Sequence, residues 1–278
     1  MMAAVHSGSF PATSAESDAG ARILVQGRDA EANLVVYAIS EAGTGASAWN
    51  VFRQHLPVRY GLRAIRLPGR ESRSAEPPLT SVQDQAVDIL HGLTKALAAD
   101  PRPYALLGSC SGATVAYEVA LLLDAASLPR PEFLAVAGQQ APWLAHSETA
   151  VRRSDQPGQD LLRWLAEGVA PPDLARLTAV FPLVERFIRA DLQAHETYLR
   201  RSADLLSCPI LVVRGARDQM VSEAACREWA HGTASGFALD TVQGGHQLLR
   251  TEPQVLADAV GRWHQATAGR DEQSDSRG

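Results

Sequence analysis

The chain of 278 residues is 46% hydrophobic and carries a formal net charge of −5. This length and apolar content suffice for one large core. Because the charge is mild and forms no basic stripe, nucleic acid is excluded as an expected partner. No apolar run approaches the roughly 20 residues that a membrane-spanning helix needs, so no membrane partner is expected either.

The three cysteines, Cys110, Cys208 and Cys226, are an odd number and lie far apart in the chain. This pattern fits a reducing cytoplasm, and it indicates neither a disulfide framework nor a zinc site. We therefore expect a cytoplasmic protein without a metal.

The two ends of the chain differ in composition from its centre. Residues 1–21 lack the basic and continuously apolar regions of a secretory signal, and residues 269–278 are polar. Both segments are predicted to be disordered tails. The remaining residues, 22–268, are predicted to form one domain.

Short apolar runs alternate with segments of helical spacing along this domain. The β-branched runs at 23–26 and 33–39 are predicted to form a hairpin or two neighbouring strands. Further strands are predicted at 61–67, 104–108, 133–138, 210–215 and 237–242, and helices at 48–56, 81–100, 113–126 and 253–268. Continuous apolar strands that alternate with helices predict an α/β fold, in which a mostly parallel central sheet has helices on both faces.

The region of about 147–200 interrupts this alternation, because it contains helical patterns only. Its predicted helices span 160–168, 173–181 and 183–200. An all-helical insertion between two strands is typical of a lid over a site at the carboxyl edge of the sheet.

A strand, a glycine turn and a helix meet at Cys110 in the stretch YALLGSCSGATVAYEVA. Glycines stand two residues before and two residues after Cys110, at Gly108 and Gly112, as in the nucleophile elbow G-x-S-x-G. They leave room for close packing of the helix on the strand. The pattern predicts that Cys110 is a nucleophile exposed at the sheet edge; a buried cysteine in a glycine turn is the alternative.

Candidate partners for this thiol follow in the chain order of an acid and then a histidine. Asp218 comes directly after the strand 210–215, and His246 lies in a glycine loop after the strand 237–242. We expect His246 to take the proton of Cys110, or to pair with its thiolate as an imidazolium, while Asp218 orients the imidazole.

Backbone N–H groups are expected to bind the oxyanion of the reaction. One belongs to Ser111, the residue after the nucleophile, at the start of a helix. The second is expected from the loop after the strand 33–39, from Glu41 or Ala42.

Several stretches in the same order resemble the stand-alone, type II thioesterases of nonribosomal peptide and polyketide assembly lines. The likeness runs from about Leu34 to Trp263 and includes RLPGRESR, GSCSGATVAYEVA, FIRADLQAHETY, SCPILVVRGARDQMVS and GGHQLL. It implies an α/β-hydrolase fold with a helical lid. It also implies that the partner is an acyl or peptidyl carrier protein whose phosphopantetheine arm holds the acyl group as a thioester, so that no cofactor of the chain's own is expected.

The chain departs from the family pattern at two places. The family elbow usually reads G-H-S-x-G, whereas here Ser109 replaces the histidine and Cys110 the serine. The early loop lacks the family's proline and has Ser40 and Glu41 in that area. A cysteine enzyme converts one thioester into another, and this nearly balanced exchange favours transfer of an acyl or aminoacyl group to a second thiol or to an amine.

Four other functions remain open at this stage. They are hydrolytic editing of carrier-bound thioesters, release by cyclisation, carrier docking without catalysis, and hydrolysis of small esters or lactones.

Overall fold

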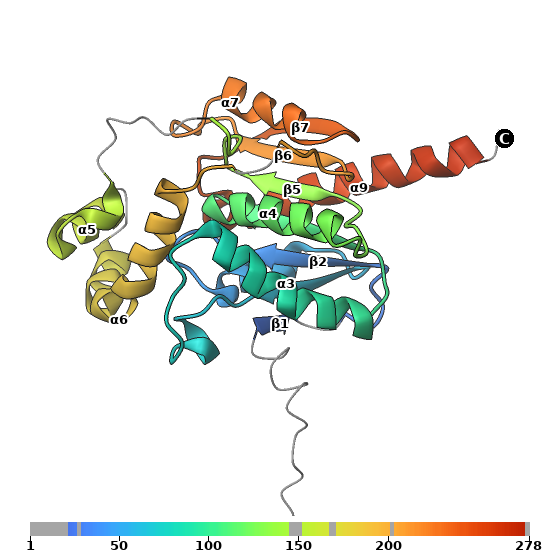
Figure 1. The fold of residues 1–278 in the computed structure, drawn as a ribbon. Coiled ribbons are helices and arrows are strands. Elements are labelled where there is room, and N and C mark those ends of the chain that lie inside the picture. Colours follow the sequence, from blue (N-terminus) through green and yellow to red (C-terminus); the bar gives the residue numbers. More distant parts are fainter. Residues whose placement is uncertain (1–21, 27–28, 145–151, 167–170, 201–202, 276–278) are drawn as a thin grey trace, which may run out of the picture.

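The computed structural model describes residues 22–26, 29–144, 152–166, 171–200 and 203–275 (Figure 1). The tail predicted at 1–21 lies outside these residues. Seven strands form one sheet in the order β1-β3-β2-β4-β5-β6-β7. They are β1 (Ile23–Gln26), β2 (Leu34–Ile39), β3 (Tyr60–Ile65), β4 (Tyr104–Ser109), β5 (Leu134–Ala137), β6 (Ile210–Gly215) and β7 (Phe237–Val242). From β3 to β7 all neighbours are parallel, which confirms the predicted mostly parallel sheet.

The first strand has a different neighbour from the one predicted. β1 pairs antiparallel with β3, where Ile23 lies opposite Ile65, and the predicted pairing with β2 is wrong. The reason is that β2 is bonded to β3 on one side and to β4 on the other, so it has no free edge. The outer edge of β3 is the one open to β1.

Helices cover both faces of the sheet (Figure 1). One face packs against α3 (Val82–Ala99) and α4 (Ser111–Ala125). The other packs against α2 (Asn50–His55) and α9 (Pro253–Asp275). The short elements between these are η1 (Ala46–Trp49), η2 (Glu71–Arg73), η3 (Arg153–Asp155), α7 (Glu223–Arg227), η4 (Glu228–Gly232) and α8 (Leu248–Thr251).

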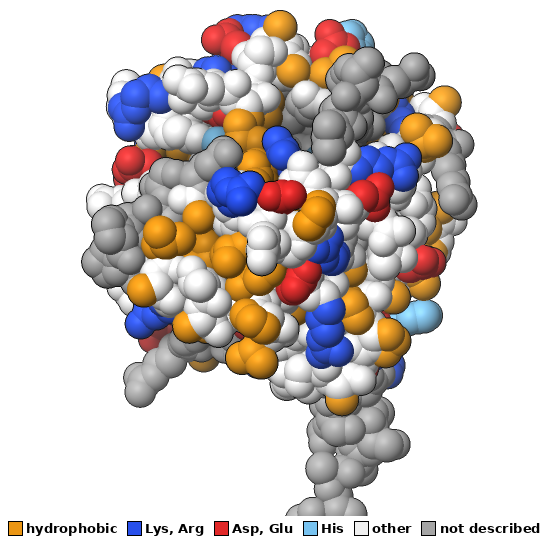
Figure 2. Space-filling view, turned by 90° about the vertical axis from the view of Figure 1, so that its left-hand side faces the viewer, with side chains coloured by type: hydrophobic (Ala, Val, Ile, Leu, Met, Phe, Trp, Pro, Cys, Tyr) orange, Lys and Arg blue, Asp and Glu red, His pale blue; other side chains and the backbone are white. Residues whose placement is uncertain are grey.

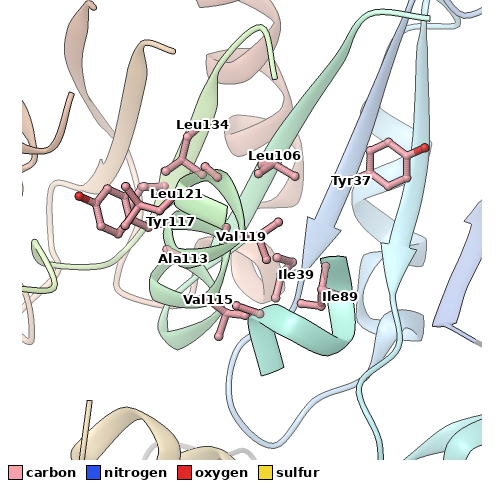
Figure 3. Close-up of a cluster of buried hydrophobic side chains, with 14 of the residues drawn as sticks. Tyr37, Ile39, Ile89, Leu106, Ala113, Val115, Tyr117, Val119, Leu121 and Leu134 are labelled. Atoms are coloured by element: carbon pink, nitrogen blue, oxygen red, sulfur yellow. The ribbon is translucent and has the colours of Figure 1, made fainter. Parts of the chain in front are cut away.

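Alternate residues of each strand supply the two cores, because successive side chains of a strand point to opposite faces. In β2, Tyr37 and Ile39 belong to the core beneath α3 and α4, whereas Val36 and Ala38 belong to the core beneath α2 and α9. Figure 3 shows the first of these cores around β2, β4 and α4. Burial on both faces explains why the strands are continuous apolar runs in the sequence.

The predicted lid lies beside the sheet as α5 (Gly158–Leu165) and α6 (Pro171–Glu196) (Figure 1). The two later helices predicted there are a single helix, which passes through Pro182. An interior proline removes one helical hydrogen bond. Phe181 and Phe187, on either side of it, are both buried against Leu161 of α5, and this burial offsets the loss.

The C-terminal helix is longer than predicted. α9 continues to Asp275, into the segment 269–278 that the sequence pattern assigns to a disordered tail. Arg, Glu and Gln in this segment have good helix propensity, and no proline interrupts them. In the described part of the chain, no helix combines the length and the apolar character needed to cross a membrane.

Two glycines let α4 approach the sheet closely enough to begin directly after β4. A Cβ atom added to Gly108 would lie 2.2 Å from the Cα of Ala113, and one added to Gly112 would lie 2.4 Å from the carbonyl oxygen of Ser40. Both obstacles are backbone atoms, which no change of rotamer can move. The turn at Cys110 therefore depends on the absence of side chains at these positions.

We expect Gly108→Ala to lower the free energy of unfolding by about 3 kcal/mol, because α4 must move off β4. Urea denaturation followed by circular dichroism measures this loss. Gly261→Ala is the matched control: it lies in α9, where the added Cβ would have no atom within 4 Å apart from its own helix backbone, and it should stabilise the chain by about 0.5–1 kcal/mol. Equal effects of the two substitutions would contradict the assigned role of Gly108.

Candidate active site

Cys110 occupies the turn between β4 and α4 with φ of 48° and ψ of −126°. This left-handed backbone is costly for any residue with a Cβ, and it persists only where the surroundings impose it. The Cys110 N–H donates to the carbonyl of Ala137 at 2.8 Å, and its carbonyl accepts from the N–H of Ala113 at 2.9 Å. The turn holds the thiol, which is partly exposed, at the carboxyl end of β4 and the N-terminus of α4.

The structure brings Cys110, His246 and Asp218 together, although they come from three separate loops. The Nε2 atom of His246 lies 3.4 Å from the Sγ atom of Cys110. The Nδ1 atom of the same ring lies 3.0 Å from Oδ2 of Asp218. Since a carboxylate accepts, Nδ1 carries a proton, and Nε2 is left to exchange a proton with sulfur.

The carboxylate of Asp218 is fully buried and has a partner for each oxygen. Its Oδ1 accepts from the backbone N–H groups of Met220 at 2.8 Å and Val221 at 3.0 Å, while its Oδ2 faces His246. Burial alone would raise the pKa of Asp218, but the hydrogen bonds from His246 and the two amides outweigh it and hold that pKa below its usual range. Asp218 is therefore an ionised partner for the imidazole.

The imidazole of His246 is held in its protonated form by the same contacts. Burial would lower the pKa of His246, but the hydrogen bonds to Asp218 and Cys110 outweigh it and raise this pKa to about 10. A protonated imidazole between a carboxylate and a sulfur can donate its Nε2 proton toward that sulfur. The geometry thus places a proton donor beside the Cys110 sulfur.

Glycines at two strand ends let the His246 loop pack against the sheet. Gly138, after β5, has φ of 62°, and an added Cβ would lie 2.7 Å from the carbonyl oxygen of His246. At the end of β6, a Cβ on Gly215 would lie 2.2 Å from the carbonyl oxygen of Gly245. Both glycines stand at the ends of predicted strands, which is the signal in the sequence that relates them to the site; no motif marks them.

The loop after β2 faces the first turn of α4. The backbone N–H of Ala42 donates to the Ser111 hydroxyl at 2.8 Å, so this loop and the residue after Cys110 are in direct contact. The side chain of Glu41 accepts a hydrogen bond from Ser109. Of the two predicted donors in this loop, the Ala42 N–H is the one the structure directs toward the elbow.

A buried ion pair connects this loop to the lid. Arg70 and Asp191 of α6 form two hydrogen bonds of 2.7 Å each. Asp191 also accepts from the N–H of Gly43 at 2.9 Å, and Arg70 donates to the carbonyl of Thr44. Sequence reasoning did not identify this pair, because nothing along the chain relates an arginine and an aspartate so far apart.

The other two cysteines lie in different surroundings. Cys208 and Cys226 are both buried. Burial raises the pKa of Cys208 to about 12 and that of Cys226 to about 11, so both stay protonated at neutral pH. Among the cysteines, Cys110 has the imidazole partner.

Comparison with known proteins identifies the family of the chain. The thioesterase domain family matches residues 36–263 of the chain. This chain belongs to the thioesterase family. It is 32% identical over 226 residues to thioesterase PikA5 of Streptomyces venezuelae, covering 80% of this chain and 78% of that protein.

Solved thioesterase structures confirm the α/β-hydrolase fold. The type II thioesterase BorB from the borrelidin biosynthetic cluster is 28% identical, with a TM-score of 0.71 over 85% of this chain and 93% of that one. The type II thioesterase YbtT from the yersiniabactin NRPS/PKS pathway is 25% identical, with a TM-score of 0.72 over 87% of this chain and 97% of that one.

In this thioesterase, we expect His246 to titrate well above its ordinary pKa of 6.5 and Asp218→Asn to move that pKa downward. The raised pKa means that the imidazolium stabilises the fold fully below pH 6.5, and that this contribution is lost as the pH rises through about 10. NMR titration of labelled histidine measures the pKa of His246. Asp258→Asn, an exposed control, should leave the pKa of His246 unchanged. A pKa near 6.5 for His246 in the wild-type chain would refute its pairing with Asp218.

Loss of the lid ion pair should destabilise the thioesterase strongly. Asp191→Asn leaves Arg70 as a buried charge without a carboxylate, so we expect the free energy of unfolding to fall by about 3–5 kcal/mol. The matched control is Asp160→Asn, whose pair with Arg163 is exposed, at 45% and 73%. Asp160→Asn should lower the free energy of unfolding by less than about 1 kcal/mol. Denaturant unfolding measures both, and equal losses would contradict the role of the buried pair.

Proposed function

We propose that this thioesterase takes an acyl or aminoacyl group from the phosphopantetheine thioester of a carrier protein onto Cys110 and transfers it to a second thiol or amine. The observation that carries this proposal is the contact of the Cys110 Sγ atom with the His246 imidazole, whose other ring nitrogen is held by the buried carboxylate of Asp218. The similarity to BorB and YbtT supports a place in a nonribosomal peptide or polyketide assembly line.

In the first half-reaction, the side chains that act are those of Cys110, His246 and Asp218. The Cys110 thiolate attacks the thioester carbonyl, and a new carbon–sulfur bond forms. The negative charge moves to the carbonyl oxygen, where the N–H groups of Ser111 and Ala42 are the proposed donors; for Ala42, the Ser111 hydroxyl must first give way. The bond to the phosphopantetheine sulfur then breaks, and that sulfur takes the proton of His246.

The second half-reaction reverses these roles. An acceptor thiol gives its proton to His246, attacks the acyl-cysteine, and releases Cys110 as a thiolate. An amine acceptor does the same and forms an amide. Because acyl-cysteine is itself a thioester, exchange with a thiol is nearly balanced in energy, and the acyl group keeps its reactivity. Sulfur at position 110 therefore suits transfer better than the oxyester that a serine would form.

The carrier protein is proposed to dock at the lid. On α6, Leu183 is 75% exposed and Val180 is 39% exposed. Figure 2, which views the molecule from this side, shows hydrophobic side chains gathered on the face together with side chains of both charges. Exposed apolar side chains that are surrounded by charged side chains of both signs are typical of a transient protein interface.

Hydrolysis is the second candidate function, because BorB and YbtT are described as type II thioesterases. In this case water replaces the acceptor thiol in the second half-reaction. The same triad serves both reactions, so the acceptor decides between them. Docking without catalysis would leave the contact between Cys110 and His246 without a role.

A carrier protein loaded with an acetyl or alanyl group tests the proposal. We expect intact mass spectrometry to show an acyl adduct on the wild-type chain and none on Cys110→Ala. With a second, unloaded carrier present, label on that carrier indicates transfer, whereas free acid indicates hydrolysis. Cys208→Ala is the matched control and should keep the adduct.

Cys110→Ser then tests the role of sulfur. We expect it to lose transfer by at least about 100-fold while hydrolysis persists, because an oxyester exchanges poorly with thiols. If Cys110→Ala still removes the acyl group at the wild-type rate, the proposed mechanism is wrong.

A further inference from the structure

The two departures from the family pattern touch each other in the structure. The Ser109 hydroxyl donates to Oε2 of Glu41 at 3.2 Å. Ser109 is buried and directly precedes Cys110, while Glu41 directly precedes Ala42, whose N–H points at the first turn of α4. The carboxylate of Glu41 therefore lies beside the residue that directly precedes the nucleophile.

This carboxylate has no cation in direct contact among the residues that the structure describes. No salt bridge joins it to a described lysine, arginine or histidine, and Ser109 is the side chain that donates to it. Arg250 and His246 act on it only at longer range, and burial raises the pKa of Glu41. A half-buried carboxylate with one neutral side-chain donor is unfavourable, and a positive ligand would relieve the cost.

The chemistry of an aminoacyl thioester supplies such a ligand at the required place. Its ammonium group is attached to the carbon next to the carbonyl that Cys110 attacks. In the proposed orientation, the carbonyl carbon lies at Sγ and its oxygen faces the N–H groups of Ser111 and Ala42. The substituents of the neighbouring carbon would then face the loop that contains Glu41, whose carboxylate is hydrogen-bonded to the residue before Cys110. An ammonium there donates a charge-assisted hydrogen bond to the carboxylate.

We propose that Glu41 determines substrate specificity by binding the free ammonium group of an aminoacyl thioester, so that amine-bearing acyl groups are the preferred substrates. This inference rests on the proposed function, because it assumes that Cys110 accepts the acyl group. Ser109 is a positioning residue, since its hydroxyl orients the Glu41 carboxylate. A charge-assisted contact of this kind favours the amine over an analogue that lacks it by about 10- to 100-fold.

Three thioesters of pantetheine that differ in one group provide the test: alanyl, lactyl and propionyl. They carry an ammonium, a hydroxyl and a hydrogen at the same carbon. The measured quantities are kcat/KM for pantetheine release, by liquid chromatography, and the adduct on Cys110, by intact mass spectrometry. We expect the wild-type chain to prefer alanyl over both others by about 10-fold or more.

Glu41→Gln removes the charge while its amide oxygen still accepts from Ser109. We expect this variant to bring the ratio of alanyl to propionyl rates close to 1. Glu31→Gln, an exposed control before β2, should keep the wild-type ratio. Circular dichroism and thermal unfolding of the three proteins show whether the fold is intact.

The outcomes separate this inference from the proposed function. If all three thioesters acylate Cys110 and Glu41→Gln leaves their ratio unchanged, the role of Glu41 is wrong and the proposed function stands. Equal rates for alanyl and lactyl thioesters also overturn it, because then a neutral donor serves as well as a cation. If no thioester acylates the wild-type chain, both proposals fail.

Discussion

The left-handed backbone at Cys110 is the constraint on which the rest of the site depends. It reverses the chain between β4 and α4 within one residue, so that the sulfur projects from the sheet edge while the next N–H groups point toward the same space. The turn exists because Gly108 and Gly112 have no side chains to keep the helix from the sheet. Once it is fixed, the ends of parallel strands β6 and β7 bring Asp218 and His246 to the same edge.

The lid is joined to this chemistry through Arg70 and Asp191 rather than through a contact with Cys110. Asp191 of α6 binds both Arg70 and the N–H of Gly43, and Gly43 follows the amide that faces the elbow. Because both charges are buried, separating them is costly. The ion pair thereby ties α6 to the loop after β2, so it connects the lid, where the carrier is proposed to dock, with the loop that is proposed to bind the oxyanion.

Sulfur at position 110 and a carboxylate at position 41 both suit the transfer of an aminoacyl group in the proposed function. In the proposed mechanism, the thiol makes the acyl-enzyme a thioester, which keeps the acyl group reactive toward a second acceptor. In the proposed binding mode, the Glu41 carboxylate lies beside the first carbon of the acyl chain. In the proposed function both features serve an aminoacyl group that is handed on, and the hydrogen bond between Ser109 and Glu41 links the two substitutions in space.

The sequence by itself determined the elements and the order of the chemical groups. Apolar runs identify the strands because these are buried on both faces, and the spacing of Gly108, Cys110 and Gly112 identifies the turn because only glycine permits that approach. The local sequence pattern did not predict two features that long-range packing decides. These are the pairing of β1 with β3 and the continuation of α6 through Pro182. Only the tertiary structure decided that Arg70 meets Asp191 and that Ser109 meets Glu41, because burial and charge pairing act between residues that no period along the chain relates.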